Sequence, residues 1–544
     1  MTIKFSEFPF KEIRPKQKAI LESINSTDKK YIIIEAETGV GKSAIATTLC
    51  RSYNKGFIIT STKQLQKQYV DDFGTKSLTS IKGKANYKCF HNPNLNCESG
   101  LCNIDKKIYA ECRRERLCEY YNIRDRACAS NIFLTSYQYF LRAIDCAEWI
   151  MPRNVLVFDE CHLFEDQVVQ WAQINLSKEY LNEKYEIFVN AGLEECVVLA
   201  DEPNETGWTK RNQEWVMSIL KLIEARRIDK FEEVKLLLGD TFGELKDIDA
   251  LTDEQLDMIS GEHKEYYELD KFYRKLKVFL KSDIDKWLID PIKGGLVLTP
   301  LDITDIFKNM INKMAVDKIV FMSATILDIN GFINVLGLQK EDVHVIRANS
   351  DFDPNKSPIV FQPTCKMNYQ ALQDKENLEK IKNKIIEILA NHPNEKGIIH
   401  TGNQLISKYI MDNIFDERLL IRLDDITNMD IIRQHQNSKN STVLVSSSLS
   451  EGVDLRGDLS RFQIIVKLPF LSLGDQRIKI KSQQGDWYLC QMFRKFVQQC
   501  GRSTRDSEDY SITYVLDSTF KYWYGKTKGK KWFSKKFMLR IIKK

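Results

Sequence analysis

Short runs of β-branched and other apolar residues alternate along most of the chain with longer stretches that suit helices. At residues 31–50, YIIIEAETGVGKSAIATTLC begins with such a run, passes through small residues and ends in a helix-compatible stretch. Beyond residue 346, the runs KGIIHT, STVLVSSS and FQIIVKLPF recur between helical stretches. Because this alternation is typical of parallel sheets covered by helices, it predicts an α/β fold with a second α/β domain towards the C-terminus.

A long segment at 166–294 interrupts the alternation. It contains charged stretches with helical periodicity, such as QEWVMSILKLIEARRIDKFEEVKLLL, and almost no proline in its middle, so we expect a mainly helical insertion. A second, cysteine-rich insertion lies earlier in the chain. The predicted organisation is a first α/β domain made of 1–84, 129–165 and 295–345, a cysteine-rich insertion at 85–128, a helical insertion at 166–294, and a second α/β domain with a basic tail at 346–544.

Composition narrows the class of protein. The 544 residues are 43% hydrophobic and 28% charged, which is typical of a globular protein. The net charge of +5 is too small to identify a nucleic-acid binder by itself. The sequence shows neither a signal-peptide pattern nor a run of about 18 apolar residues, so we expect no membrane partner and a cytoplasmic or nucleoid location, nuclear if eukaryotic. The 13 cysteines are expected to be reduced thiols.

The loop after the first apolar run has the context of a phosphate-binding loop. It departs from the strict glycine at its first position, but alanine is also small enough for the loop to curl around phosphates. Backbone N–H groups supply an anion cradle, Lys42 is expected to reach the outer phosphates, and the Ser43 hydroxyl can ligate Mg²⁺. The predicted ATP-binding residues of the loop are Ala36, Glu37, Thr38, Gly39, Val40, Gly41, Lys42 and Ser43.

A second apolar run, at 154–158, ends in two carboxylates. Nucleotide hydrolysis needs such a pair, with Asp159 for the metal and Glu160 to orient or deprotonate water. We interpret Cys161 as a packing residue. His162 is either a loop histidine or a residue that couples the ATP site to the rest of the protein.

These residues resemble a superfamily 2 helicase, and further motifs resemble the DEAH-like branch that contains XPD and DinG. The motifs are TSTKQLQ at 60–66 for the first DNA-contacting motif, KGKANYKC at 82–89 for the lead-in to the iron–sulfur domain, MSAT at 322–325 for motif III, SEGVD at 450–454 for motif V, and QQCGRSTR at 498–505 for motif VI. The resemblance implies two RecA-like motor domains with an iron–sulfur insertion and a helical arch insertion in the first. It also implies ATP, Mg²⁺ and a [4Fe–4S] cluster as cofactors.

Motif VI has a physical interpretation of its own. Hydrolysis builds negative charge on the transferring phosphoryl group, and arginines from a second domain can stabilise that charge when the cleft closes. Arg502 and Arg505 are three apart, so on a helix they share one face. Gln498, one turn earlier, is a candidate for positioning water or nucleotide. Near the N-terminus, Arg14 and Gln17 resemble the adenine-side motif.

Six cysteines fall between 89 and 128: Cys89, Cys97, Cys102, Cys112, Cys118 and Cys128. Their irregular gaps fit a zinc ribbon poorly and an iron–sulfur cluster better. The resemblance implies Cys89 and Cys118 as ligands and favours Cys102 with Cys112 for the middle pair, with Cys97 as the possible substitute. Cys128 is expected to be buried as a small hydrophobic residue. Zinc and unligated thiols remain the alternatives.

Basic residues interleave with tyrosines in this insertion, and we expect Tyr87, Tyr109, Tyr120 and Tyr121 to offer stacking platforms to single-stranded DNA. The overall prediction is an ATP-dependent helicase acting on single-stranded and forked DNA, with 5′ to 3′ polarity implied by the resemblance and no protein partner identified. The alternatives are a DNA-stimulated translocase that unwinds poorly and a redox-responsive DNA-binding module with a vestigial motor. The basic, aromatic tail after Lys521 either contacts DNA or packs.

Overall fold

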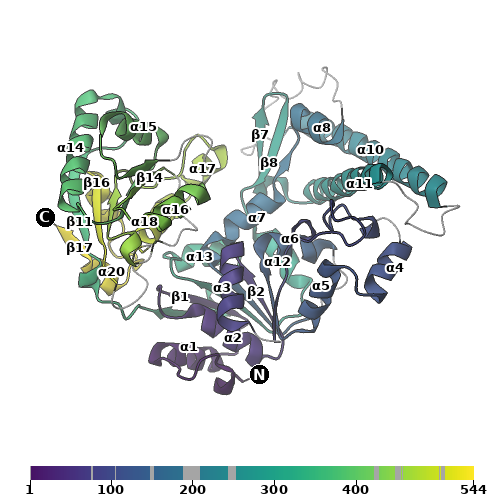
Figure 1. Ribbon diagram of the computed structural model, residues 1–544, viewed down its shortest axis with the longest axis horizontal. Coiled ribbons are helices and arrows are strands. Elements are labelled where there is room, and N and C mark those ends of the chain that lie inside the picture. The colour runs from purple at the N-terminus through teal and green to yellow at the C-terminus, as the bar shows by residue number, and fades with distance from the viewer. Residues whose placement is uncertain are drawn as a thin grey trace.

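A computed structural model describes most of the chain. The described residues are 2–74, 77–103, 106–146, 152–187, 209–242, 253–421, 428–447, 455, 457–501, 503 and 509–543. Two seven-stranded parallel sheets form two α/β domains, and a group of long helices projects from the first (Figure 1). The predicted fold class is therefore confirmed for the two sheet domains.

The first sheet collects strands from distant parts of the sequence, in the order β10-β1-β9-β5-β2-β4-β3. The strands are β1 (Tyr31–Ala36), β2 (Gly56–Thr60), β3 (Leu78–Ser80), β4 (Ile132–Ser136), β5 (Val155–Asp159), β9 (Lys318–Ser323) and β10 (Val343–Ala348). The helices of this domain are α1 (Pro15–Asn25), α2 (Lys42–Ser52), α3 (Lys63–Phe73), α6 (Tyr137–Cys146), α7 (Phe164–Ala172), α12 (Thr304–Asn312) and α13 (Ile329–Val335). Since β1, β9 and β5 are neighbours, the ends of β1 and β5 that carry the predicted ATP-site residues lie close together.

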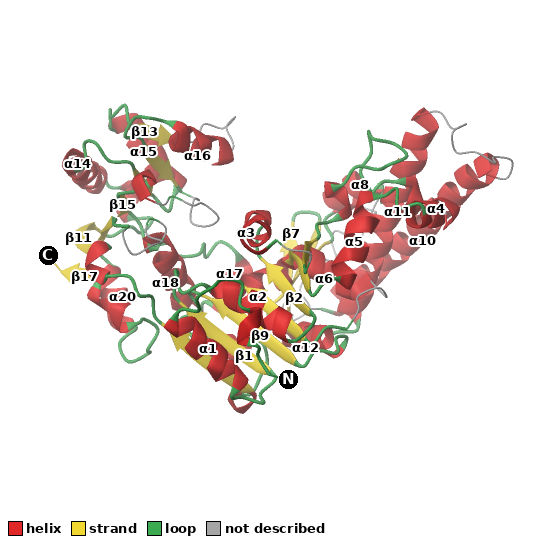
Figure 2. Ribbon diagram, turned by 60° about the horizontal axis from the view of Figure 1, so that its bottom comes forward, coloured by secondary structure: helices red, strands yellow, loops and turns green. Residues whose placement is uncertain are grey.

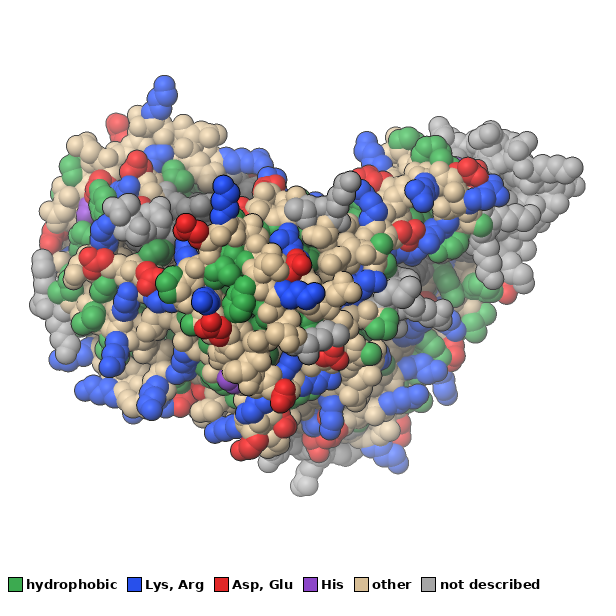
Figure 3. All heavy atoms as spheres, turned by 90° about the horizontal axis from the view of Figure 1, so that it is seen from below, with side chains coloured by type: hydrophobic (Ala, Val, Ile, Leu, Met, Phe, Trp, Pro, Cys, Tyr) green, Lys and Arg blue, Asp and Glu red, His purple; other side chains and the backbone are tan. Residues whose placement is uncertain are grey.

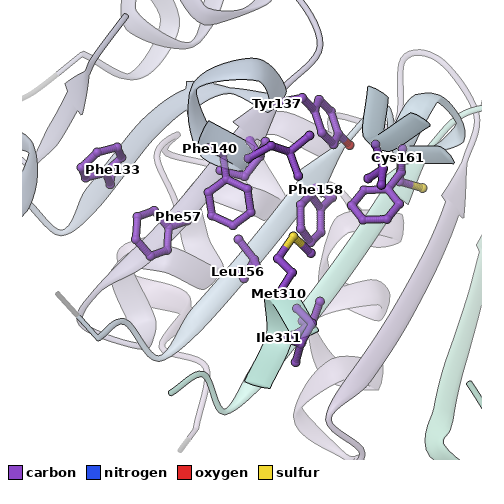
Figure 4. Close-up of a cluster of buried hydrophobic side chains, with 14 of the residues drawn as sticks. Phe57, Phe133, Tyr137, Phe140, Leu156, Phe158, Cys161, Met310 and Ile311 are labelled. Carbon is purple, nitrogen blue, oxygen red and sulfur yellow. The ribbon is translucent and has the colours of Figure 1, made fainter. Parts of the chain in front are cut away.

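Aromatic side chains fill the core on one face of this sheet. Phe57 of β2, Phe158 of β5 and Phe140 of α6 pack together in Figure 4, with ring centroids 5.8 Å apart for Phe57 and Phe140 and 5.7 Å apart for Phe140 and Phe158. All three are almost fully buried. Such a close-packed aromatic layer fixes α6 on the sheet, so the end of β5 is held on a rigid base.

The second sheet has the order β13-β14-β12-β15-β16-β11-β17. Its strands are β11 (Ile359–Cys365), β12 (Gly397–His400), β13 (Leu419–Ile421), β14 (Val443–Ser446), β15 (Phe462–Ile465), β16 (Ile512–Asp517) and β17 (Ile541–Lys543). Its helices are α14 (Lys375–Asn391), α15 (Gln404–Asn413), α16 (Asn428–Asn437), α17 (Gln476–Lys481), α18 (Trp487–Cys500), α19 (Phe520–Lys526) and α20 (Lys535–Leu539). The basic tail packs within this domain, because Trp532 and Phe537 are buried and β17 pairs with β11.

The insertion at 166–294 is mainly helical where it is described, as the periodicity predicts. Its helices are α8 (Lys178–Tyr185), α10 (Lys210–Phe242) and α11 (Asp253–Leu280), and we call this group the arch. The sequence pattern did not predict the antiparallel sheet at its base, which consists of β6 (Ile174–Asn175), β7 (Trp287–Ile292) and β8 (Gly295–Pro300). Figure 2 shows the arch on the same side of the molecule as α4 (Lys106–Arg114) and α5 (Glu119–Ala129) of the cysteine-rich insertion.

Candidate functional site

The loop between β1 and α2 is shaped for phosphate binding. Gly39 and Gly41 have φ angles of +89° and +90°, in the left-handed region that favours glycine. A Cβ at Gly39 would lie 2.3 Å from the Phe352 ring, and one at Gly41 would lie 2.2 Å from Nε2 of Gln17. Lys42 Nζ donates to the Ala36 carbonyl at 3.1 Å, so its ammonium group lies along the loop. The loop therefore has the tight curvature that exposes backbone N–H groups to an anion.

The predicted adenine-side residues lie against this loop. Arg14 Nη1 donates to the Gly39 carbonyl at 3.0 Å, and the Arg14 backbone N–H donates to Oε1 of Gln17, also at 3.0 Å. Gln17 is buried. Within the loop itself, Ala36 and Val40 are buried, and Glu37 accepts a hydrogen bond from the Ser350 backbone N–H. Glu37 therefore ties the loop to the segment that leads to the second domain.

The Asp159 carboxylate is held at both oxygens. Tyr69, on α3, donates its hydroxyl proton to Oδ2 of Asp159 at 2.8 Å, and the Glu160 backbone N–H donates to Oδ1 at 2.9 Å. Burial and the Asp159 charge both raise the pKa of Tyr69, so its hydroxyl stays protonated. Asp159, a predicted Mg²⁺ ligand, is thus held by a tyrosine, which sequence reasoning missed because this tyrosine is not part of any motif.

The two neighbouring carboxylates have opposite pKa shifts. Burial raises the pKa of Asp159, and the adjacent Glu160 charge raises it further. Burial alone would also raise the pKa of Glu160, but hydrogen bonding with His162 and the Lys42 charge outweigh it and lower the pKa. Ser323 Oγ donates to Oε2 of Glu160 at 3.3 Å, which adds to that lowering. Glu160 is therefore ionised near neutral pH, as a water-orienting carboxylate must be.

His162 connects this loop to the second domain. Its Nδ1 lies 2.8 Å from Ser323 Oγ, and its Nε2 lies 2.6 Å from Nε2 of Gln498, on α18. Gln498 Nε2 also donates to Thr325 Oγ1 at 3.3 Å. The sequence left two roles open for His162, and the structure places it between Glu160 and the second domain. Gln498, predicted to position water or nucleotide, here contacts His162 and Thr325.

Arg494, one turn before Gln498 on α18, extends the same contact. Its guanidinium is buried and donates to the carbonyls of Thr325 at 3.1 Å, His162 at 3.2 Å and Ile326 at 3.2 Å. Sequence reasoning passed over Arg494 because it precedes motif VI. An arginine at a position on the otherwise apolar face of a predicted helix is the sequence signal that could have identified Arg494. Arg502 and Arg505, and residues 450–454 of motif V, lie outside the described residues, and α18 ends at Cys500.

A second contact between the domains centres on Glu165, on α7. Oε1 of Glu165 accepts from Arg477 Nη2 at 2.6 Å and from Lys481 Nζ at 2.7 Å, and Oε2 accepts from Trp487 Nε1 at 3.0 Å. The side chains of Glu165, Arg477 and Lys481 are each only 8% exposed. Arg477 Nε also donates to the Pro300 carbonyl, at the end of β8, at 3.2 Å. Glu165 and Arg477 together therefore join the first domain, the arch base and α17.

The cysteine-rich insertion gathers five buried thiols. They are Cys89, Cys97, Cys102, Cys112 and Cys118. Cys97 Sγ lies 3.7 Å from Cys118 Sγ, and Cys102 Sγ lies 4.0 Å from the Tyr121 hydroxyl. Burial raises the pKa of Cys89, and the nearby Cys102 and Cys118 raise it further. Among the residues that the structure describes, no three His, Cys, Asp or Glu side chains are arranged around a single metal ion.

Two expectations for this insertion need correction. Tyr87, Tyr120 and Tyr121 are at most 8% exposed, so they form the core of the insertion and are not stacking platforms; Tyr109 alone of the four is exposed, at 37%. Cys128 is half-buried where full burial was expected. The Cys128 backbone carbonyl accepts a hydrogen bond from Arg153 Nη2 at 3.0 Å.

Comparison with known proteins agrees with this architecture. Residues 380–537 match the family described as Helicase C-terminal domain, and residues 10–194 match the family described as Type III restriction enzyme, res subunit. The chain is 22% identical to the probable ATP-dependent helicase MJ0942 of Methanocaldococcus jannaschii, over 97% of this chain and 95% of the relative. It is 21% identical to the ATP-dependent DNA helicase YoaA of Escherichia coli, over 94% of this chain and 92% of the relative.

The fold is similar to that of a solved XPD helicase, with a TM-score of 0.64 and 16% identity over 98% of this chain and 100% of that one. A loop of phosphate-binding shape on one parallel-sheet domain, joined through the loop after β5 to a second such domain, is the arrangement expected of an ATP-dependent helicase. The matches support similarity of the chain to superfamily 2 helicases of the XPD/DinG type. None of the described helices is long and apolar enough to cross a membrane.

Proposed function

We propose that this protein is an ATP- and Mg²⁺-dependent DNA helicase that moves 5′ to 3′ on single-stranded DNA and separates forked duplexes. The observation that carries the proposal is the contact of His162 with both Glu160 and Gln498. A motor must link the carboxylate that orients water to the position of a second domain, and this histidine joins the two.

The residues of the ATP site fit their expected ligands. A hydroxyl from Ser43 and a carboxylate from Asp159 are oxygen donors of the kind that Mg²⁺ prefers. Magnesium, when bound, neutralises charge on the phosphates. Lys42 would swing from the Ala36 carbonyl to the outer phosphates, and Glu160 would orient the attacking water. Arg502 and Arg505 would stabilise the transferring phosphoryl group from the second domain when the cleft closes.

A cluster of cations supports a nucleic-acid path between the arch and the first domain. Lys184 of α8, Lys271 and Lys275 of α11, and Arg142 of α6 interact with one another, and the acidic groups that act on these cations are Glu268 and Glu98. Burial and the three neighbouring cations lower the pKa of Lys275 to about 8. Like charges held together are unfavourable unless a polyanion offsets them, as a phosphate backbone would. Elsewhere, Lys and Arg are mixed with Asp and Glu on the face in Figure 3.

The gathered thiols support a [4Fe–4S] cluster in the same insertion. We propose Cys89, Cys102, Cys112 and Cys118 as its ligands, with Cys97 as the possible substitute. Five buried thiols near one another could supply the four ligands that such a cluster needs. The α11 helix contacts the segment Leu101–Asn103, so such a cluster would lie beside the arch.

Strand displacement tests the proposal most directly. Purified protein is given ATP and Mg²⁺ with forked DNA, RNA or hybrid duplexes that carry either a 5′ or a 3′ single-stranded tail. We expect unwinding of DNA forks that offer a 5′ tail, and none with Lys42→Ala. DNA-stimulated ATP hydrolysis without strand separation would favour the translocase alternative. DNA binding without any hydrolysis would favour the vestigial motor.

A further inference from the structure

Tyr69 is a buried residue at the candidate ATP site, and the proposed hydrolysis mechanism assigns it no role. It is the seventh residue of α3 and is fully buried. Its single hydroxyl meets the side chain of Asp159, one of the two residues proposed to ligate Mg²⁺. Structural packing alone would be served by phenylalanine, so the hydroxyl calls for its own explanation.

The direction of this hydrogen bond is set by chemistry. An ionised carboxylate only accepts, so Tyr69 donates its one proton to Oδ2 of Asp159, at 2.8 Å. Phenylalanine at this position would leave that buried oxygen without this donor.

The Asp159 carboxylate is oriented by the same contact. Its other oxygen accepts from the Glu160 backbone N–H at 2.9 Å, so the plane of the carboxylate is fixed at both ends. Each oxygen has a further lone pair for a metal or a metal-bound water. Outer groups of this kind orient metal ligands and tune their affinity.

We propose that Tyr69 is a positioning residue for Mg²⁺, which holds the Asp159 carboxylate in the geometry that binds the metal with nucleotide. This inference rests on the proposed function, because it takes Asp159 as a metal ligand. It adds a residue that belongs to no nucleotide motif and lies on a different helix.

The position of Tyr69 on α3 gives this role a further consequence. The helix begins inside the TSTKQLQ motif, with Thr62 as its N-cap, and Lys63 Nζ donates to Asn86 Oδ1 of the cysteine-rich insertion at 2.7 Å. A shift of α3 therefore moves the hydroxyl that orients the Asp159 carboxylate. Metal affinity and the position of α3 are linked through one side chain.

The test compares two buried tyrosines that both contact Asp159. Tyr69→Phe removes the hydroxyl at the carboxylate, and Tyr137→Phe removes a hydroxyl that donates to the Asp159 main-chain carbonyl at 3.0 Å. Tyr137 is equally buried, so the two variants make similar changes to packing. The affinity of Mn²⁺, used in place of Mg²⁺, is measured in the presence of ADP from the electron paramagnetic resonance signal of free Mn²⁺.

We expect Tyr69→Phe to weaken Mn²⁺ binding about 10- to 100-fold, and to raise the Mg²⁺ concentration for half-maximal ATP hydrolysis by a similar factor. Tyr137→Phe should change neither by more than about 3-fold, with thermal denaturation confirming that both variants are folded. Wild-type Mn²⁺ affinity in folded Tyr69→Phe, or equal losses in both variants, would overturn the inference. A wild-type protein that binds Mn²⁺ with ADP but hydrolyses no ATP would instead count against the proposed function alone.

Discussion

Replacing Glu165 by glutamine should destabilise the second domain far more than replacing its neighbour Asp166 by asparagine. Glu165→Gln keeps the shape of the side chain but removes the charge that Arg477 and Lys481 share at 2.6 and 2.7 Å. Both cations stay buried, at 8% exposure, and lose their counter-charge. Asp166 also faces Arg477, at 3.7 Å, but its side chain is 53% exposed.

The two substitutions differ in the expected loss of free energy of unfolding. Removing one partner of a buried ion pair costs about 3–5 kcal/mol, because the remaining charge is uncompensated. An exposed pair contributes about 0–1 kcal/mol. In a domain of about 200 residues, each kcal/mol shifts the melting temperature by roughly 2–4 °C, so Glu165→Gln should lower the transition by roughly 6–20 °C and Asp166→Asn by at most about 4 °C.

Differential scanning calorimetry of the intact protein measures these shifts. A double-mutant cycle with Lys481→Met isolates the charge contribution, because removing the cation as well should restore much of the loss. The coupling between the two positions should be at least about 2 kcal/mol. Equal shifts in Glu165→Gln and Asp166→Asn, or a coupling near zero, would refute the view that this carboxylate anchors the second domain.

Three further predictions concern hydrolysis, DNA and the thiols. Lys42→Ala and Glu160→Gln should each abolish DNA-stimulated ATP hydrolysis, while Glu160→Gln should still bind ATP in a fluorescent-nucleotide titration. Near-normal turnover in either variant would contradict the assigned roles. Burial and the surrounding cations lower the pKa of Lys275 to about 8. Raising the pH from 7 to 9 should therefore remove its charge and weaken the binding of single-stranded DNA, measured by fluorescence anisotropy. In Lys275→Arg this pH-dependent loss of binding should largely disappear. Anaerobically purified protein should contain about four irons per chain with negligible zinc, and Cys118→Ser should lose them whereas Cys128→Ser should not; stoichiometric zinc would rule out the iron–sulfur assignment.

Much of the candidate nucleotide site could be predicted from sequence because each of its parts is a short run of consecutive residues. The loop that ends at Lys42 and Ser43, and the carboxylates after β5, each follow an apolar strand whose end is visible as a pattern. Neighbouring parallel strands then bring those ends to one edge of the sheet. The alternation of apolar runs likewise predicts both sheet domains, since strand periodicity and helix length are local properties.

The contacts that join these parts could not be predicted in the same way. Tyr69, Glu165 and Arg494 each act on residues at least 90 positions away in the chain, and no local spacing marks them. The prediction that the tyrosines of the cysteine-rich insertion are stacking platforms was wrong for a related reason. An aromatic residue beside lysines is compatible with either a stacking surface or a small core, and only the packing of Tyr120 and Tyr121 decides between them.

The contact of Arg477 with both Glu165 and the Pro300 carbonyl has a consequence for how the parts of the protein communicate. Pro300 ends the strand β8 at the base of the arch, and Arg477 belongs to the second domain. A change in the position of α17 therefore acts on the arch without passing through the nucleotide. Such coupling is reciprocal. If domain closure changes the free energy with which the arch binds a ligand, that ligand changes the free energy of domain closure by the same amount. DNA at the arch would then act as an allosteric effector of ATP binding, and ATP as an effector of DNA, with equal coupling free energies.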